Sequence, residues 1–72
     1  MTEQEFLRKM QDDVLVTEDP VTMDLRLDAS DLWDSLSIVG FIAMAKMTAG
    51  KKIGRQKLET VKTVRDLYQM LQ

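Results

Sequence analysis

The tripeptide Asp34-Ser35-Leu36 holds the residue types in this chain that could carry chemistry. A serine hydroxyl at the start of a helix lies where unpaired backbone N–H groups and the helix dipole favour an attached anion. The adjacent Asp34 carboxylate would repel a phosphate unless a divalent cation lay between them. Asp34 is therefore a candidate Mg²⁺ ligand in a metal-assisted transfer. No neighbouring residue in the sequence supplies a base for Ser35, so a second enzyme would have to take its proton.

The same residues also have a purely structural interpretation. Aspartate is a common helix N-cap, and Ser35 would then be the first helical residue without any further role. Both interpretations predict that a helix begins at this position, and the three residues alone do not decide between them.

Composition limits the other chemistry open to the chain. The 72 residues carry a formal net charge of -2 and include no cysteine and no histidine. Disulfides, Cys/His metal sites and Ser–His or Cys–His catalysis are thereby excluded. A chain of this length forms one small domain, residues 1–72, and buries roughly 60% of its unfolded surface. We expect a module that works through its surface or a modification, and not an enzyme in its own right.

Four stretches have helical spacing, and none alternates as a strand does. Capping boxes at Thr2–Glu5 and Thr63–Asp66 precede the first and the last, and Gly50 is a natural stop after the second. The stretch Leu36–Met47 is apolar on nearly all sides, so this helix is buried on most sides or shows apolar surface to a partner. The sequence predicts an all-α fold with helices over residues 3–14, 36–47, 56–61 and 64–71.

The stretch from Leu15 to Asp34 lacks a helical period. A loop of this length is unusual unless it is functional or held by apolar anchors of its own. Trp33, at its end, either packs the loop against the core or flanks a group attached to the serine. We expect the anchors of the loop to be Leu25, Leu27 and Leu32.

Charge is divided unevenly between the two halves. The first 36 residues hold ten of the twelve acidic side chains but only three of the ten basic ones. We expect the halves to attract each other; the alternative is that the basic half steers an anionic partner. The longest apolar run, Ile38–Ala45, is far shorter than the about 20 residues of a membrane span. No targeting segment is evident at the N-terminus, and we expect a cytoplasmic location without a membrane span.

The order of these features resembles one family over essentially the whole chain. An amphipathic helix is followed by a long acidic loop, the tripeptide, an apolar helix, Lys52-Ile53, a short helix and a last helix beginning Thr63-Val64. Ser35 lies almost at mid-chain, and residues 58–67 are similar to the family's passage between its third and fourth helices. In these respects the chain resembles the acyl carrier proteins.

The resemblance implies a four-helix bundle of acyl-carrier type, with a long loop between the first two helices and a short third helix. It implies that a phosphopantetheinyl transferase moves 4′-phosphopantetheine from coenzyme A to Ser35, with Asp34 as a transient Mg²⁺ ligand. The thiol of this arm then carries an acyl or aminoacyl group as a thioester. An acyl- or aminoacyl-loading ligase supplies that group, and a ketosynthase or other acyltransferase takes it.

In such proteins the acyl chain can withdraw between the helices. Methionine side chains adapt well to a guest of variable shape, and three of them fall in the predicted core. Ordinary packing is the alternative for these residues, which are Met10, Met44 and Met70.

The chain departs from the typical family pattern in its charges. The helix over 36–47 has no acid after Asp34, and Arg55 and Lys57 make the short helix basic where family members are acidic. We take a stripe on one side of helix 36–47, together with Asp34, as the partner-recognition face, with burial under the loop as the alternative. These departures favour a specialised fatty-acid, polyketide, peptide or modified-lipid pathway. The stripe consists of Leu36, Val39, Gly40 and Ala43.

Two further function classes stay open. The chain could be an unmodified helical protein-interaction module that docks through helix 36–47. It could also bind nucleic acid through its basic second half, but the acidic overall balance and the lack of interleaved aromatic residues argue against this. We therefore expect a monomer without a nucleic-acid partner.

Overall fold

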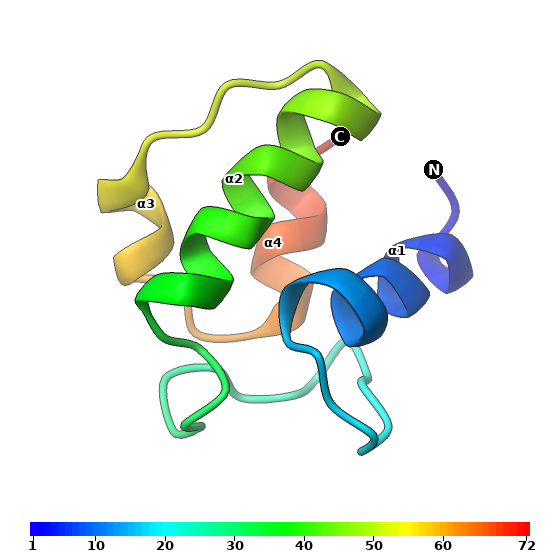
Figure 1. Cartoon of the computed structure of the whole chain (residues 1–72), viewed down its shortest axis with the longest axis vertical. Helices are drawn as coiled ribbons and strands as arrows, with labels where there is room; N and C mark the ends of the chain where they lie inside the picture. Colours follow the sequence, from blue (N-terminus) through cyan, green and yellow to red (C-terminus); the bar gives the residue numbers. More distant parts are fainter.

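Helices are the only regular elements of this chain. The computed structural model describes all 72 residues. The elements are α1 (Glu3–Lys9), the π-helix η1 (Met10–Val14), α2 (Ser35–Ala49), α3 (Arg55–Glu59) and α4 (Val64–Met70) (Figure 1). The expectation of an all-α fold with four α-helices is confirmed.

Local signals in the sequence set several helix ends. The Thr2 hydroxyl accepts a hydrogen bond from the Glu5 N–H at 3.2 Å, and the Glu5 carboxylate accepts one from the Thr2 N–H. Thr63 and Asp66 form the same reciprocal pair at the start of α4. Gly50 ends α2 in the left-handed conformation, with φ at 65°. These three predicted boundaries are confirmed.

Two predicted helices differ in detail. Residues 10–14, expected to continue the first α-helix, form a π-turn in which the Leu15 N–H donates to the Met10 carbonyl at 2.7 Å. Val14, in this turn, and Leu15, which follows it, are both buried in the core. The short helix spans 55–59 and not 56–61, because the backbone leaves the helical region at Thr60.

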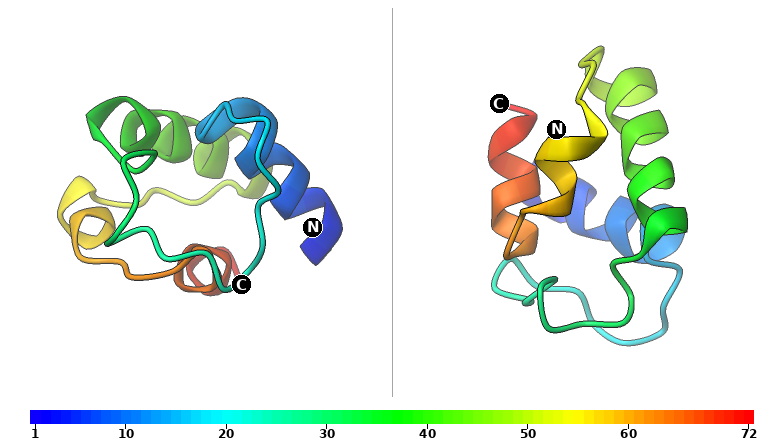
Figure 2. Two further views of the ribbon diagram at one scale, coloured as in Figure 1. Left: turned by 90° about the horizontal axis from the view of Figure 1, so that it is seen from below. Right: turned by 90° about the vertical axis from the view of Figure 1, so that its left-hand side faces the viewer.

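The helices enclose one apolar core. Helix α2 packs against η1 and against α3, and α4 lies on the opposite side of the molecule from α2 (Figure 2). Fifteen buried apolar residues form the core. Met10 and Met44 are among them, whereas Met70 is only half-buried. The fully buried side chains include Phe6, Phe41, Leu58 and Leu67.

The long loop is held by backbone hydrogen bonds to the segment that leads into α4. The Leu27 N–H donates to the Lys62 carbonyl at 2.7 Å, and the N–H groups of Val64 and Arg65 donate back to loop carbonyls at 3.1 and 2.9 Å. Apolar side chains add to this attachment: Leu27 is buried, and Leu25 and Leu32 pack half-buried on the core, as predicted. Two further anchors, Val21 and Met23, were not anticipated.

Charged side chains form two ion pairs. Arg26 and Asp28 pair within the loop at 2.7 Å, and Arg65 pairs with Asp24 at 2.9 Å. Only the second joins the acidic half of the chain to the basic half, so the expected attraction is realised at a single contact. None of the helices has the length and apolar character needed to cross a membrane.

Val16 is the one residue other than glycine with a positive φ, at 48°. A β-branched side chain in this region costs about 1–3 kcal/mol of strain. The side chain is 72% exposed, so its removal sacrifices little packing. We therefore expect Val16→Gly to raise the midpoint of thermal unfolding by several degrees (~4–8 °C), measured by circular dichroism.

Val16→Ala is the matched control, because alanine removes the apolar branches but keeps the Cβ atom that disfavours a positive φ. It should give at most a small part of the gain. Equal gains in the two variants would show that removal of the apolar side chain, and not relief of backbone strain, is responsible.

Candidate functional site

Ser35 is the first residue of α2, and its side chain is exposed. The Arg55 guanidinium, at the start of α3, donates a hydrogen bond from Nη2 to Ser35 Oγ at 2.9 Å. The hydroxyl of Ser35 therefore lies at the junction of two helices and remains accessible from solvent. A partner enzyme can reach this oxygen without unfolding any part of the chain.

Asp34 caps α2, as predicted from the sequence. Its Oδ1 accepts a hydrogen bond from the Ser37 backbone N–H at 3.0 Å, and the Ser37 hydroxyl accepts one from the Asp34 N–H at 2.8 Å. Ser37 is buried, and its Oγ also lies 2.8 Å from the Leu32 carbonyl, to which it donates. This reciprocal pair ties the end of the loop to the first turn of α2 and fixes where Ser35 lies.

The capping bonds also set the ionisation of Asp34. The hydrogen bond from the Ser37 backbone N–H is the main cause that holds the pKa of Asp34 below its usual value. The side chain is therefore a carboxylate at neutral pH. No cluster of acidic side chains in this chain could hold a metal ion by itself. Asp34 by itself offers one carboxylate ligand to a divalent cation.

The predicted partner face is largely exposed. Leu36 is 82% exposed and Val39 53%, and Ala43 is also exposed. Gly40 is half-buried against η1, where an added Cβ would lie 3.7 Å from the Asp13 carbonyl oxygen. The alternative of burial under the long loop is wrong for this stripe.

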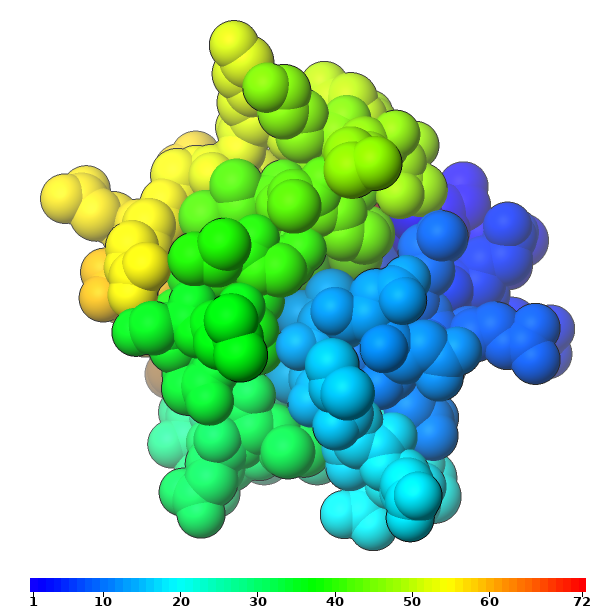
Figure 3. Space-filling view, in the orientation of Figure 1, coloured from blue at the N-terminus to red at the C-terminus, as the bar shows by residue number.

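These four residues line one wall of a groove between α2 and η1. The groove has a volume of about 350 Å³, and Val14, Leu15 and Val16 contribute apolar surface from its other side. Figure 3 shows α2 in green and η1 in light blue lying next to each other on one face of the molecule. Three exposed aspartates also line the groove, so this face is apolar with an acidic component: Asp13, Asp31 and Asp34.

Trp33 packs the loop against the core. Its indole Nε1 donates to the Leu58 carbonyl at 2.9 Å, and its ring meets Phe41 edge-on with centroids 6.3 Å apart. The packing interpretation of Trp33 is confirmed, and this side chain joins the residue before Asp34 to the end of α3.

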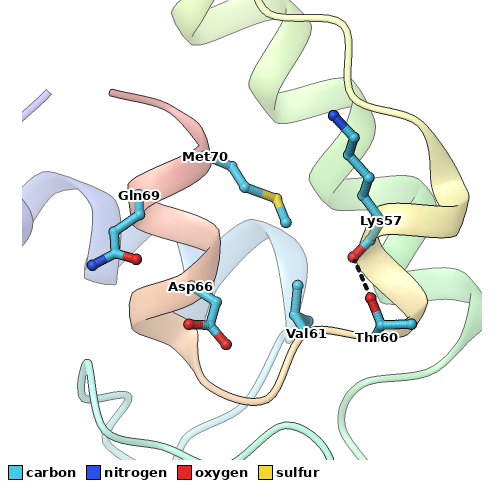
Figure 4. Close-up of a pocket in the computed structure, with 6 residues that line it drawn as sticks. All are labelled: Lys57, Thr60, Val61, Asp66, Gln69 and Met70. Carbon is cyan, nitrogen blue, oxygen red and sulfur yellow. Dashed lines mark hydrogen bonds between the residues drawn. The ribbon is translucent and has the colours of Figure 1, made fainter.

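A second, more open hollow lies elsewhere, between α3 and α4. It has a volume of about 410 Å³, and Met70 extends from α4 into it towards α3 (Figure 4). Four of its six lining residues are polar: Lys57, Thr60, Asp66 and Gln69. Ser35 does not line this hollow, and an acyl chain would find little apolar surface there.

Sequence reasoning missed two residues of this site. Ser37 had a local signal, since it stands three positions after the Asp34 cap, where a capping-box partner belongs. Arg55 was noted only as a departure in charge. Its contact with Ser35 joins residues twenty positions apart, and no pattern along the sequence reports such a contact.

Comparison with protein-family models, with curated proteins and with solved structures finds no match to this chain.

The caps predict loss of stability in acid. Backbone hydrogen bonds lower the pKa of Asp34 and of Asp66 below the ordinary 3.8. A carboxyl whose pKa is lowered on folding stabilises the fold above its unfolded pKa, and this contribution is lost as the pH falls through the folded pKa. We expect the thermal midpoint to fall steadily between about pH 5 and pH 2.

Asp34→Asn keeps an acceptor at the cap but removes one of these titrations, so its midpoint should fall less over the same range. Glu59→Gln is the control, because Glu59 is exposed and makes no side-chain hydrogen bond. A slope for Asp34→Asn equal to that of the parent would contradict a charged cap.

Proposed function

We propose that this chain is an acyl carrier protein of the four-helix type, modified on Ser35 with 4′-phosphopantetheine. The observation that carries the proposal is the exposed Ser35 hydroxyl at the first position of α2, directly after the Asp34 cap. Order and length of the elements also agree with the family pattern, with a long loop before α2 and a short α3. The attached thiol would carry an acyl or aminoacyl group as a thioester.

The residues of the site fit the attachment reaction. Ser35 Oγ attacks the phosphorus of coenzyme A that bears the pantetheine, a new O–P bond forms, and 3′,5′-ADP leaves with the electrons of the broken P–O bond. A base on the transferase takes the serine proton. Asp34, ionised and adjacent, is suited to contribute one oxygen to the Mg²⁺ that neutralises the phosphates.

The groove between α2 and η1 is the surface best suited to partner enzymes in this proposal. It begins beside Ser35 and continues along α2 through the exposed residues Leu36 and Val39. A loading ligase, a ketosynthase or another acyltransferase that reaches the arm must approach this end of the molecule. The apolar side chains of the groove supply the contact area for a partner. The three aspartates favour a partner with basic side chains.

An unmodified interaction module is the second candidate. The observation that favours it is the exposure of large apolar side chains along α2, where Leu36 and Met47 are 82% and 86% exposed. Such residues mark docking surfaces whether or not a serine nearby is modified. The two candidates differ in whether the hydroxyl of Ser35 reacts.

Intact mass after incubation with coenzyme A, Mg²⁺ and a broad-specificity phosphopantetheinyl transferase separates them. We expect one phosphopantetheine adduct on the parent chain and none on Ser35→Ala, with Ser30→Ala as a control that still loads. Asp34→Ala should load much more slowly, at least tenfold, because it loses both a metal ligand and the cap that positions Ser35. A parent chain that stays unmodified under these conditions would sink the carrier proposal.

Val39→Asp tests the groove as the partner face. Val39 is half-exposed, so the variant should fold and accept phosphopantetheine at nearly the parent rate. Acyl transfer to a ketosynthase should fall about tenfold, which is the usual cost of losing one important interface side chain. Met47→Asp is the control, since Met47 is exposed on α2 but does not line this groove. Equal losses in loading and transfer would show instead that Val39 supports the fold.

A further inference from the structure

We infer that Arg55 binds the phosphodiester of the phosphopantetheine arm and so holds the root of the arm against α3; this inference rests on the proposed function. The ligand class is a singly charged phosphodiester attached through Ser35 Oγ. Arg55 acts as a positioning residue in this assignment, and it takes no part in breaking or forming bonds.

The starting observation is a contact between two helices. Arg55 Nη2 lies 2.9 Å from Ser35 Oγ, and this is the side-chain hydrogen bond that Arg55 makes. The two ion pairs of the molecule involve Arg26 and Arg65, so no carboxylate competes for the Arg55 guanidinium. A neutral hydroxyl satisfies one of its five N–H donors and leaves the others available.

A phosphodiester on Ser35 would suit these remaining donors. Its phosphorus is bonded directly to the oxygen that Arg55 already contacts, so two anionic oxygens come within reach of the guanidinium without movement of the helices. Paired N–H donors match two phosphate oxygens, and such charge-assisted bonds are stronger than a bond to a hydroxyl.

Charge balance also requires a cation at this position. The carboxylate of Asp34 stands beside Ser35, and after the Mg²⁺ of the transfer has left, it would face the new phosphodiester as a like charge. Arg55 is the cation that the structure places within hydrogen-bond distance of Ser35. Lys57, on the same helix, lines the hollow between α3 and α4 instead (Figure 4).

The position of Arg55 is itself supported by packing. Leu58 is fully buried, and its carbonyl accepts the hydrogen bond from the Trp33 indole. Trp33 immediately precedes the cap of α2, so α3 is held near the start of α2 at both of its ends. The guanidinium thus needs little rearrangement to meet a phosphate, which keeps the entropic cost of binding small.

The experiment compares unmodified and loaded protein for the parent, Arg55→Ala, Arg55→Lys and Lys57→Ala. Loading is first established by intact mass. In low salt, we expect loading to raise the thermal midpoint by ~2–5 °C more in the parent than in Arg55→Ala. Arg55→Lys should keep part of this difference, because it keeps the charge but loses the paired donors. Lys57→Ala should behave as the parent does.

A second readout does not depend on the stability of the variants. The ³¹P resonance of the loaded parent should differ from that of loaded Arg55→Ala in low salt. The difference should shrink in about 1 M salt, where the screening length falls to ~3 Å. In the parent alone, the ³¹P resonance should move with salt, whereas in Arg55→Ala it should move much less.

The possible outcomes distinguish the Arg55–phosphodiester contact from the carrier function on which it rests. If the parent gains no adduct, both are overturned. If it loads but the ³¹P resonance and the midpoint gain are the same in parent and Arg55→Ala, the carrier function stands and the phosphate contact is overturned. A loss in Lys57→Ala equal to that in Arg55→Ala would show a general effect of basic charge on α3, and would also overturn the assignment to Arg55.

Discussion

The reciprocal hydrogen bonds between Asp34 and Ser37 are the constraint on which the site depends. They fix the residue at which α2 begins, and they turn Ser35 outwards while Ser37 is buried two positions later. The place where Ser35 presents its hydroxyl therefore follows from where a capping bond forms.

The surroundings of the site are held by two different attachments. Backbone hydrogen bonds between the loop and residues 62–65 restrain the middle of the loop. The indole of Trp33 attaches the end of the loop to α3 through a hydrogen bond. The first attachment keeps the 20-residue connection ordered although it contains no helix. The second keeps α3, a helix of only five residues, in register with the start of α2. The first attachment is accompanied by the Asp24–Arg65 ion pair, whereas the second rests on a hydrogen bond and apolar packing.

Much of this arrangement could be read from local sequence. Each helix cap, and the stop after α2, is formed by residues only a few positions apart, so the sequence alone predicts it. These are the caps at Thr2, Asp34 and Thr63 and the stop at Gly50. The π-turn at 10–14 was not predictable, because the spacing of Phe6, Met10 and Val14 fits a continued α-helix equally well. The groove, whose second wall is η1, and the approach of Arg55 to Ser35 were not predictable either. Contacts of this kind depend on how distant segments pack together, and the periodicity of apolar residues along the sequence does not predict them.

The chain contains a single tryptophan, and the fold places it where loop, α2 and α3 meet. Its indole N–H is bonded to a carbonyl of α3 and its ring rests edge-on against Phe41. The fluorescence of this one indole consequently reports on the junction of the loop, α2 and α3. A ligand or a partner protein that moves α3 away from α2 would change the emission wavelength and the intensity of this fluorescence, and no added label would be needed.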